Sequence, residues 1–305
     1  MGLFSGRKTV HVDSDILVIG GGMAGCGATY ESRYWGRDLK IVCVEKANIE
    51  RSGAVAQGLY AINCYMGMQW DENQPEDHVR YARNDLMGLV REDLGYDIAR
   101  HVDSTVHKFE EWGLPIMKDP ETGRYLREGK WQIMIHGESY KPIMAEAARK
   151  AATEVYNRIM VTHLLMDKTK ANRVAGAVGF NVRTGDFYVF RAKAVILATG
   201  GGGKAWQITS NSWEYTGDGF ALAYDAGAEL LDMEFTQFHP TGMVWPPSVR
   251  GILVTEGVRG DGGILLNSEG ERFMFNYIPE KFAAETADSE EEAERWLDGD
   301  KNARR

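Results

Sequence analysis

The stretch DILVIGGGMAG, residues 15–25, decides the fold predicted for this chain of 305 residues. Its apolar run ends directly in three glycines, which is typical of a buried parallel strand that leads into a tight turn. The next segment, MAGCGATYESRYWG, has helical spacing, and LKIVCVEK at 39–46 again has the pattern of a buried strand. A strand, a helix and a strand within about 30 residues predict a βαβ unit, and therefore a Rossmann-like α/β domain with a parallel sheet.

The glycines of this turn match G-x-G-x-x-G, with Gly20, Gly22 and Gly25 at the three fixed positions. Between a strand and a helix, such glycines let backbone N–H groups approach a pyrophosphate at the helix N-terminus. Glu45 ends the second strand about 20 residues later, where a carboxylate accepts hydrogen bonds from ribose hydroxyls. This context favours a dinucleotide site over a glycine-rich packing turn, and we assign Lys46, the next residue, to the same site.

A second buried strand running into glycines, AVILATGG at 194–201, is expected to return to the same cofactor. The alternative is a separate nucleotide site, because Gly200, Gly202 and Ala205 loosely fit G-x-G-x-x-A. That alternative describes a two-nucleotide disulfide reductase, which needs a redox pair of cysteines. The three cysteines of this chain form no C-x-x-C pair, so one shared cofactor is favoured.

Hydrophobic periodicity predicts the elements between these two glycine turns. Amphipathic helices are expected over 76–113 and 141–157. Three strands are expected at 159–166, 173–182 and 186–201, with Thr184-Gly185 as the turn of a β-meander.

Proline and glycine become more frequent after about residue 230. We therefore expect one domain over 1–230 and the beginning of a second over 231–305, built of short strands and loops and ending in a charged tail.

Composition excludes some classes of function. The net charge of −9 argues against non-specific nucleic-acid binding, which needs a basic face. No apolar run approaches the roughly 18 residues of a membrane span, so no direct span is expected. The opening MGLFSGRKTVHVDSD has no apolar core of signal-peptide length, and Gly6 occupies the Ser/Thr position of the myristoylation pattern. It is expected to be a short cytoplasmic lead-in.

The sparse cysteines, Cys26, Cys43 and Cys64, fit a reducing compartment. They are also too few for an iron–sulfur cluster, which typically needs about four thiolates. A cluster that exchanges electrons with this protein would therefore lie on another chain.

Longer segments resemble known flavoproteins. Residues from about 15 to 201 resemble the alpha subunit of dissimilatory adenylylsulfate reductase, through ERSGAVAQGLYAIN, DLMGLVREDLGYDIARHVDSTVHKFEEWGLPI, GKWQIMIHGESYKPI and FYVFRAKAVILATGG. From about residue 208 the chain is similar to succinate dehydrogenase and fumarate reductase flavoproteins, through TSNSWEYTGDG, MEFTQFHPTGMVWPPSVRGILVTEGVRGDGG and ERFMFNYIP. Both families share one flavoprotein fold, an FAD-binding domain with a capping domain that binds substrate.

The resemblance implies FAD as cofactor. Relatives that attach flavin covalently do so through a histidine just after the serine that matches Ser52. Gly53 stands at that position, so noncovalent FAD is expected. Weaker candidates for the flavin environment are Glu138 and Trp206. The full set of FAD contacts expected from motif and resemblance is Gly20, Gly22, Gly25, Glu45, Lys46, Ser52, Gly53, Ala56, Gln57, Gly58, Asn63, Thr199, Gly200, Gly201 and Asp218.

The resemblance also implies a site for a small anionic substrate. His239 of QFHPTG matches a histidine that binds a dicarboxylate, and Thr255 and Glu256 of VTEG match the second substrate segment. Arg259 is a candidate charge partner, with a structural ion pair as the alternative. The family's catalytic arginine is expected beyond residue 305, because the chain corresponds to about the first half of such a subunit.

Three functions remain open from the sequence. The first is a flavoprotein subunit that interconverts succinate and fumarate by hydride transfer to or from flavin N5. The second is the alpha subunit of an adenylylsulfate reductase, and the third is a truncated FAD-binding domain without turnover. Either enzyme implies a cytoplasmic location and an iron–sulfur protein subunit as electron partner, including attachment to the inner membrane through partner subunits.

Overall fold

The computed structural model describes residues 6–67, 73–128, 131–255, 257–258, 263–280, 289 and 291–292. The chain divides into two compact units, Met1–Leu253 and Val254–Arg305. The sheets, the helices and the cavity described below belong to the first unit. In the second, the described residues include one short 3₁₀ turn, η5 (Phe273–Tyr277). The functional division expected near residue 230 stays a prediction.

Within the described residues, six strands form the main sheet, in the order β6-β2-β1-β9-β8-β7. The first four of these are parallel, and β8 and β7 continue the sheet as an antiparallel meander. The predicted α/β fold, a parallel sheet with a β-meander, is therefore confirmed. The strand bounds are β1 Thr9–Ile19, β2 Ile41–Glu45, β6 Glu154–Asn157, β7 Ile159–Met166, β8 Val174–Asn181 and β9 Phe187–Leu197.

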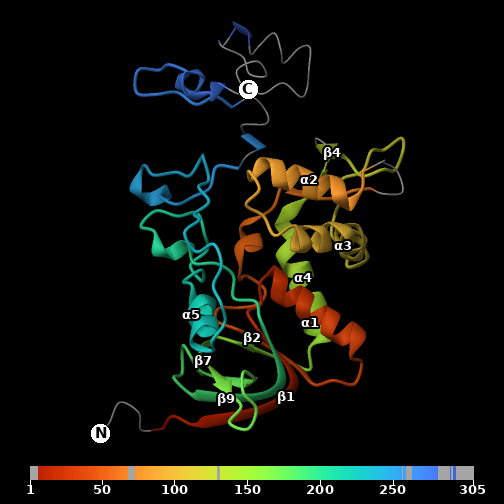
Figure 1. Cartoon of the computed structure of the whole chain (residues 1–305), viewed down its shortest axis with the longest axis vertical. Helices are drawn as coiled ribbons and strands as arrows, with labels where there is room; N and C mark the ends of the chain where they lie inside the picture. The colour runs from red at the N-terminus through yellow and green to blue at the C-terminus, as the bar shows by residue number, and fades with distance from the viewer. Residues whose placement is uncertain are drawn as a thin grey trace. The chain divides into compact units, whose positions relative to one another are not determined.

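Helices cover both faces of the sheet, as parallel strands require. Figure 1 shows α1 (Met23–Trp35) and α4 (Tyr140–Ala151) on one side and α5 (Asp218–Asp225) on the other. Alternate residues of β1 contribute to the hydrophobic cores on the two faces of the sheet. Val18 packs toward α1 and α4, whereas its neighbour Leu17 packs with the meander and α5. Each such side chain is fully buried, which stabilises the fold by about 1.5–3 kcal/mol.

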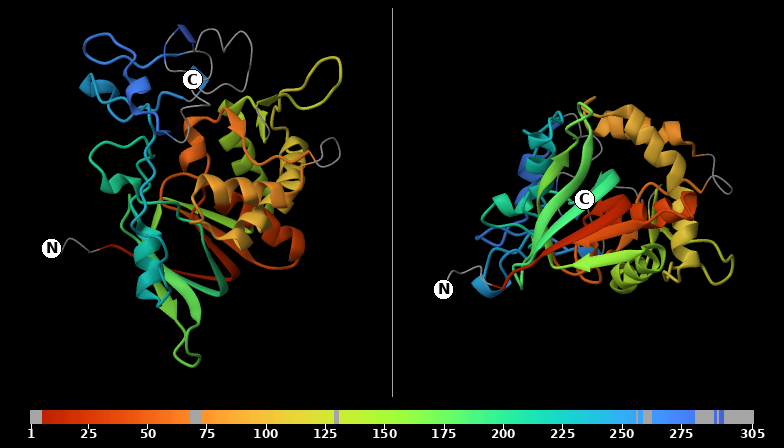
Figure 2. Two further views of the ribbon diagram at one scale, coloured as in Figure 1. Left: turned by 45° about the horizontal axis from the view of Figure 1, so that its top comes forward. Right: turned by 90° about the horizontal axis from the view of Figure 1, so that it is seen from below.

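A smaller antiparallel sheet, with the described order β3-β5-β4, and two further helices lie in the same unit (Figure 2). Tyr65, Val106 and Ile133 form a separate small core between them. The bounds are η1 Ala54–Gln57, β3 Ala61–Ile62, α2 Pro75–Asp85, α3 Glu92–Glu111, β4 Arg127–Glu128, β5 Gln132–Met134, η2 Gly137–Ser139, η3 Gly203–Ala205 and η4 Pro247–Val249.

The segment 76–113 is helical as expected, and the structure divides it into two helices, α2 and α3. Gly88 has a φ of 86°, and its N–H donates to the carbonyl of Arg83, which closes the end of α2. A second helix can then begin at Glu92 in another direction.

The structure corrects two element boundaries that were expected from the sequence. The helix expected over 141–157 ends at Ala151, and Glu154–Asn157 instead extends the sheet beside β2 as β6. The expected lead-in is not simply a lead-in, because β1 already begins at Thr9 and its first half pairs with β9. In both places an open strand edge offered hydrogen bonds that a local pattern does not reveal.

Candidate functional site

A cavity of about 530 Å³ opens at the carboxyl ends of β1, β2 and β9. This is where ligands bind in open α/β sheets, and its volume lies in the range of about 300–1,000 Å³ that is usual for small-molecule sites. Its lining residues are Ile19, Gly20, Gly22, Met23, Ala24, Val44, Glu45, Lys46, Ser52, Gly53, Ala54, Val55, Ile159, Val161, Leu197, Ala198, Thr199, Gly200, Glu214, Tyr215, Asp218, Gly219, Phe220, Leu222 and Ala223.

The glycine turn brings backbone to the cavity because no side chain fits there. A Cβ on Gly20 would lie 2.2 Å from the carbonyl oxygen of Ala198, and one on Gly25 would lie 1.7 Å from the carbonyl oxygen of Gly20. Gly20 also has a φ of 106°, which favours glycine. The turn therefore places the N-terminus of α1 at the cavity, where unpaired N–H groups and the helix dipole favour an anion.

Glu45 ties the end of β2 to the glycine turn. It is 5% exposed, and its Oε2 accepts a hydrogen bond from the Gly21 N–H at 2.6 Å. Its Oε1 accepts one from the Ala47 N–H at 2.7 Å. Each carboxylate oxygen has a second acceptor position, so a ligand hydroxyl can still be bound from the cavity side.

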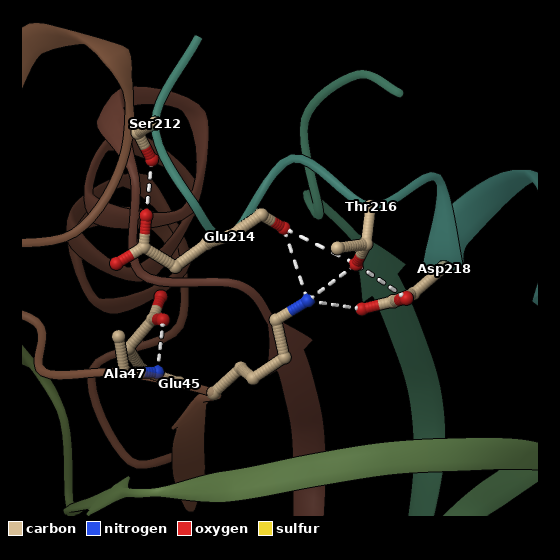
Figure 3. Close-up of polar contacts among 7 residues, drawn as sticks. Glu45, Ala47, Ser212, Glu214, Thr216 and Asp218 are labelled. Atoms are coloured by element: carbon tan, nitrogen blue, oxygen red, sulfur yellow. Dashed lines mark hydrogen bonds and ion pairs between the residues drawn. The ribbon is translucent and has the colours of Figure 1, made fainter. Parts of the chain in front are cut away.

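Lys46 joins β2 to the segment that leads into α5. Its ammonium donates to the Glu214 carbonyl at 3.0 Å, the Thr216 hydroxyl at 2.6 Å and the Asp218 carboxylate at 2.5 Å. Figure 3 shows these oxygens converging from Glu214, Thr216 and Asp218. The ion pair with Asp218 is partly buried, at 23% and 22% side-chain exposure. It closes one wall of the cavity with two opposite charges.

The end of β9 packs against the beginning of α5. A Cβ on Gly219 would lie 1.9 Å from Oγ1 of Thr199, so this glycine allows α5 to touch the strand. The Tyr215 ring lies beside Gly200, and its hydroxyl accepts a hydrogen bond from the Ala54 N–H at 3.3 Å. Thr199, Gly200 and Asp218, all expected at the cofactor, line the cavity together.

The segment around Ser52 forms another part of the cavity wall. Ser52 is 1% exposed, and its hydroxyl lies 3.5 Å from the Gly21 carbonyl as a donor. Gly53 has a φ of 85°, and a Cβ there would lie 3.0 Å from Cα of Gly22. Small residues are therefore required where two backbone segments meet at the cavity.

Some predicted residues lie elsewhere. Gly25 packs behind the turn rather than on the cavity wall. Gly201 follows Gly200 in the chain but does not line the cavity. Ala56, Gln57, Gly58 and Asn63 are outside the lining, as are the weaker candidates Glu138 and Trp206. Their assignments remain predictions.

The substrate-side candidates are divided between the two units and the residues outside the description. His239 lies in the first unit, and its Nδ1 accepts a hydrogen bond from the Thr241 N–H at 3.2 Å. Thr255 belongs to the second unit. Glu256 and Arg259 lie outside the described residues. These assignments also remain predictions.

Several lining residues were missed by sequence reasoning. Glu214 and Tyr215 precede the T-G-D-G motif, and that adjacency was the available signal. Met23 follows the glycine turn at 20–22, Phe220 follows the T-G-D-G motif, and both line the cavity as well. No pattern in the sequence connects Tyr215 to Ala54, its partner 161 residues away.

Two buried thiols lie beneath the site. Burial raises the pKa of Cys26, and it raises the pKa of Cys43 to about 12. The Cys26 thiol donates to the Gly21 carbonyl at 3.3 Å, so it serves as a neutral hydrogen-bond donor under the turn.

None of the helices in the described part of the chain has the length and apolar composition of a membrane span.

The turn, the acidic strand end and the cavity together define a dinucleotide-binding α/β domain. Residues 15–304 match the protein family described as the FAD binding domain. The chain belongs to this family, and FAD is its cofactor. The structure fits that group, because backbone closes the space around the glycine turn while the cavity stays open in front of the N-terminus of α1.

Known relatives belong to redox enzymes. The chain is 44% identical to the alpha subunit of the adenylylsulfate reductase of Megalodesulfovibrio gigas, over 72% of this chain and 38% of the relative. It is 36% identical to a subunit of the fumarate reductase (CoM/CoB) of Methanothermobacter marburgensis, over 88% of this chain and 49% of the relative. It therefore spans half or less of the length of these curated relatives.

A solved structure has the same fold. The quinol fumarate reductase of E. coli superimposes with a TM-score of 0.76 at 28% identity, over 90% of this chain and 46% of that one. The flavoprotein family predicted from the sequence is thereby confirmed, including both branches of the resemblance.

Proposed function

We propose that this chain is part of a flavoprotein subunit that interconverts succinate and fumarate. One observation carries the proposal. The fumarate reductase relatives match about nine tenths of the chain, whereas the adenylylsulfate reductase relative matches 72%. The wider match supports a dicarboxylate substrate, because the segments with His239 and Thr255 lie in the C-terminal quarter of the chain.

FAD, when bound, supplies the exchange of a hydride with the substrate. The chain's own residues bind the cofactor and orient it. The α1 N-terminus holds the pyrophosphate, Glu45 accepts from the ribose, and the wall formed by Ser52 and Gly53 lets the backbone approach the flat ring.

On the substrate side, His239, Thr255 and Glu256 bind the dicarboxylate. Donors at both ends of a dianion hold it in one orientation, which lowers the entropic part of the barrier. The proton is delivered by the arginine that the resemblance places beyond residue 305. Electrons pass to a partner subunit that carries iron–sulfur clusters, and the proposed location is the cytoplasm or the inner face of the membrane, through partner subunits.

A second candidate is reduction of adenylylsulfate, or the reverse reaction. The 44% identity to the adenylylsulfate reductase relative favours it, since identity to the fumarate reductase relative is 36%. In that reaction sulfite and AMP are the partners of the flavin.

Ligand titrations followed by the flavin absorption spectrum distinguish the candidates. Malonate or fumarate should shift the spectrum with saturation. His239→Ala should weaken that response, and His163→Ala, which changes an exposed histidine on β7, should not. Bleaching by sulfite that AMP strengthens would replace the proposal with the second candidate. A stable yellow protein that responds to none of these ligands would contradict both.

A further inference from the structure

A lysine is buried directly behind the glycine turn. Lys141 on α4 is 2% exposed, and its ammonium donates to the Gly21 carbonyl and lies 3.5 Å from Sγ of Cys26. Among the described residues, no carboxylate forms an ion pair with it. The buried carboxylate of Glu45 accepts from the N–H of the same Gly21, but it makes no ion pair with Lys141. A buried ammonium without an ion-pair partner is costly, so a further negative charge near it would be stabilising.

The neighbouring thiol does not supply that charge. Burial raises the pKa of Cys26, although Lys141 acts in the opposite direction. The thiol therefore stays neutral near pH 7, and it donates to the same Gly21 carbonyl.

The hydrogen bonds to Gly21 set the direction of the next peptide group. The carbonyl of Gly21 accepts from Lys141, from Cys26 at 3.3 Å and from Ser52 at 3.5 Å. The peptide bond to Gly22 is trans, because the only cis bond of the described residues precedes Pro246. In a trans peptide the carbonyl and the following N–H point in opposite directions. Lys141 and Cys26 lie outside the cavity lining and Ser52 is part of it. Together they hold the Gly21–Gly22 peptide so that the Gly22 N–H points away from Lys141, and Gly22 is part of the lining.

We propose that Lys141 is the positioning residue of the pyrophosphate-binding turn and provides the positive charge that the FAD pyrophosphate neutralises. It acts through the Gly21–Gly22 peptide rather than by contact, since it does not line the cavity. Low dielectric between the ammonium and the cavity keeps their attraction strong. The inference rests on FAD as the cofactor and is independent of the choice between dicarboxylate and adenylylsulfate.

The test compares two substitutions on the same helix. Lys141→Met removes the buried charge with little change in length, and Lys150→Met removes an exposed charge, 75% exposed and paired with Glu146, as the matched control. Apoprotein is titrated with FAD at low and high salt. Lys141→Met should bind FAD about tenfold more weakly than wild type at low salt, with a smaller loss of affinity on adding salt. Lys150→Met should bind like wild type, and Lys141→Arg, which keeps the charge, should recover part of the affinity.

Thermal unfolding of the apoprotein separates positioning from simple packing. Without FAD, Lys141→Met should melt at or above the wild-type temperature, because a buried ammonium without an ion-pair partner is gone. With FAD it should gain a smaller increase in Tm than wild type. Equal FAD affinity in the two methionine variants would overturn the proposal, and so would a lower apoprotein Tm in Lys141→Met. A wild-type chain that binds FAD but ignores both substrate classes would contradict only the proposed function.

Discussion

Replacing Gly25 by alanine tests whether the close approach of α1 to the strand is what builds the cofactor site. The new Cβ would lie 1.7 Å from the carbonyl oxygen of Gly20, and real contacts of this kind begin near 3.0 Å. The helix and the turn must therefore separate by about 1.3 Å. Gly20 has little room to move, because the Ala198 carbonyl packs against its α-carbon. A Cβ on Gly20 would lie only 2.2 Å from the carbonyl oxygen of Ala198.

Gly27→Ala is the matched control, since it lies two residues further along α1 and a Cβ there meets nothing within 4 Å. Both substitutions gain about 1 kcal/mol of helix propensity. The difference between them isolates the steric conflict, which for backbone pressed on backbone should reach about 3 kcal/mol. At roughly 2–4 °C per kcal/mol, this predicts a gap in Tm of roughly 6–12 °C, with Gly27→Ala above wild type.

Urea unfolding followed by tryptophan fluorescence gives the free energies, and FAD titration of the apoproteins gives the affinities. Gly25→Ala should also lose at least about tenfold in FAD affinity, because the N–H groups of α1 move away from the cavity. If the two alanine variants matched in stability and in FAD affinity, the close approach would have no part in building the site.

Three other changes test separate parts of the site. Lys46→Met should destabilise the protein by about 1–2 kcal/mol and weaken FAD binding, because it leaves Asp218 without its cation. Lys40→Met is the control, because it breaks an exposed pair with Glu154 and should cost less than about 1 kcal/mol in urea unfolding. Equal losses in the two variants would contradict the role assigned to Lys46. Acid precipitation should leave the flavin in the supernatant, as expected with Gly53 in place of a tethering histidine, and yellow colour on the pellet would contradict this. Because burial raises the pKa of Cys43 from 9.0 to about 12, the unfolded chain releases this proton first as pH rises. The stability it contributes is complete below about pH 9 and should fall by roughly 1.4 kcal/mol per pH unit up to about pH 12, and Cys43→Ala should remove that part of the slope in urea unfolding.

The sequence predicted the parallel sheet because its strands are buried on both faces and read as continuous apolar runs. It failed where tertiary contacts decide between two local possibilities. Leu86 and Leu89 continue a helical spacing, yet they are 50% and 61% exposed and flank the turn that separates α2 from α3. Likewise, EVYN at 154–157 could extend α4, but pairing of Glu154 with Val42 adds it to the sheet.

The candidate site was predictable where one short segment contains the chemistry. Gly20 and Glu45 belong to a motif with fixed spacing, Asp218 was expected from the resemblance alone, and all three line the cavity. Lys141 belongs to no such motif. It reaches Gly21 across 120 residues, and only the packing of α4 against α1 brings the ammonium there.

The pairing of β1 with β9 also determines the order in which the protein can fold. Thr9 pairs with Phe187 and Ile19 with Leu197, so the central strand finds one of its two neighbours only across about 178 residues. Such distant pairing is slow because a long loop must close before any contact forms. During synthesis, β1 and β2 are therefore made long before the wall they share with β9, and the cavity is complete only when the chain reaches Ala223. FAD is expected to bind late in folding. Because it binds only the completed site, it should shift the folding equilibrium toward the completed sheet by mass action.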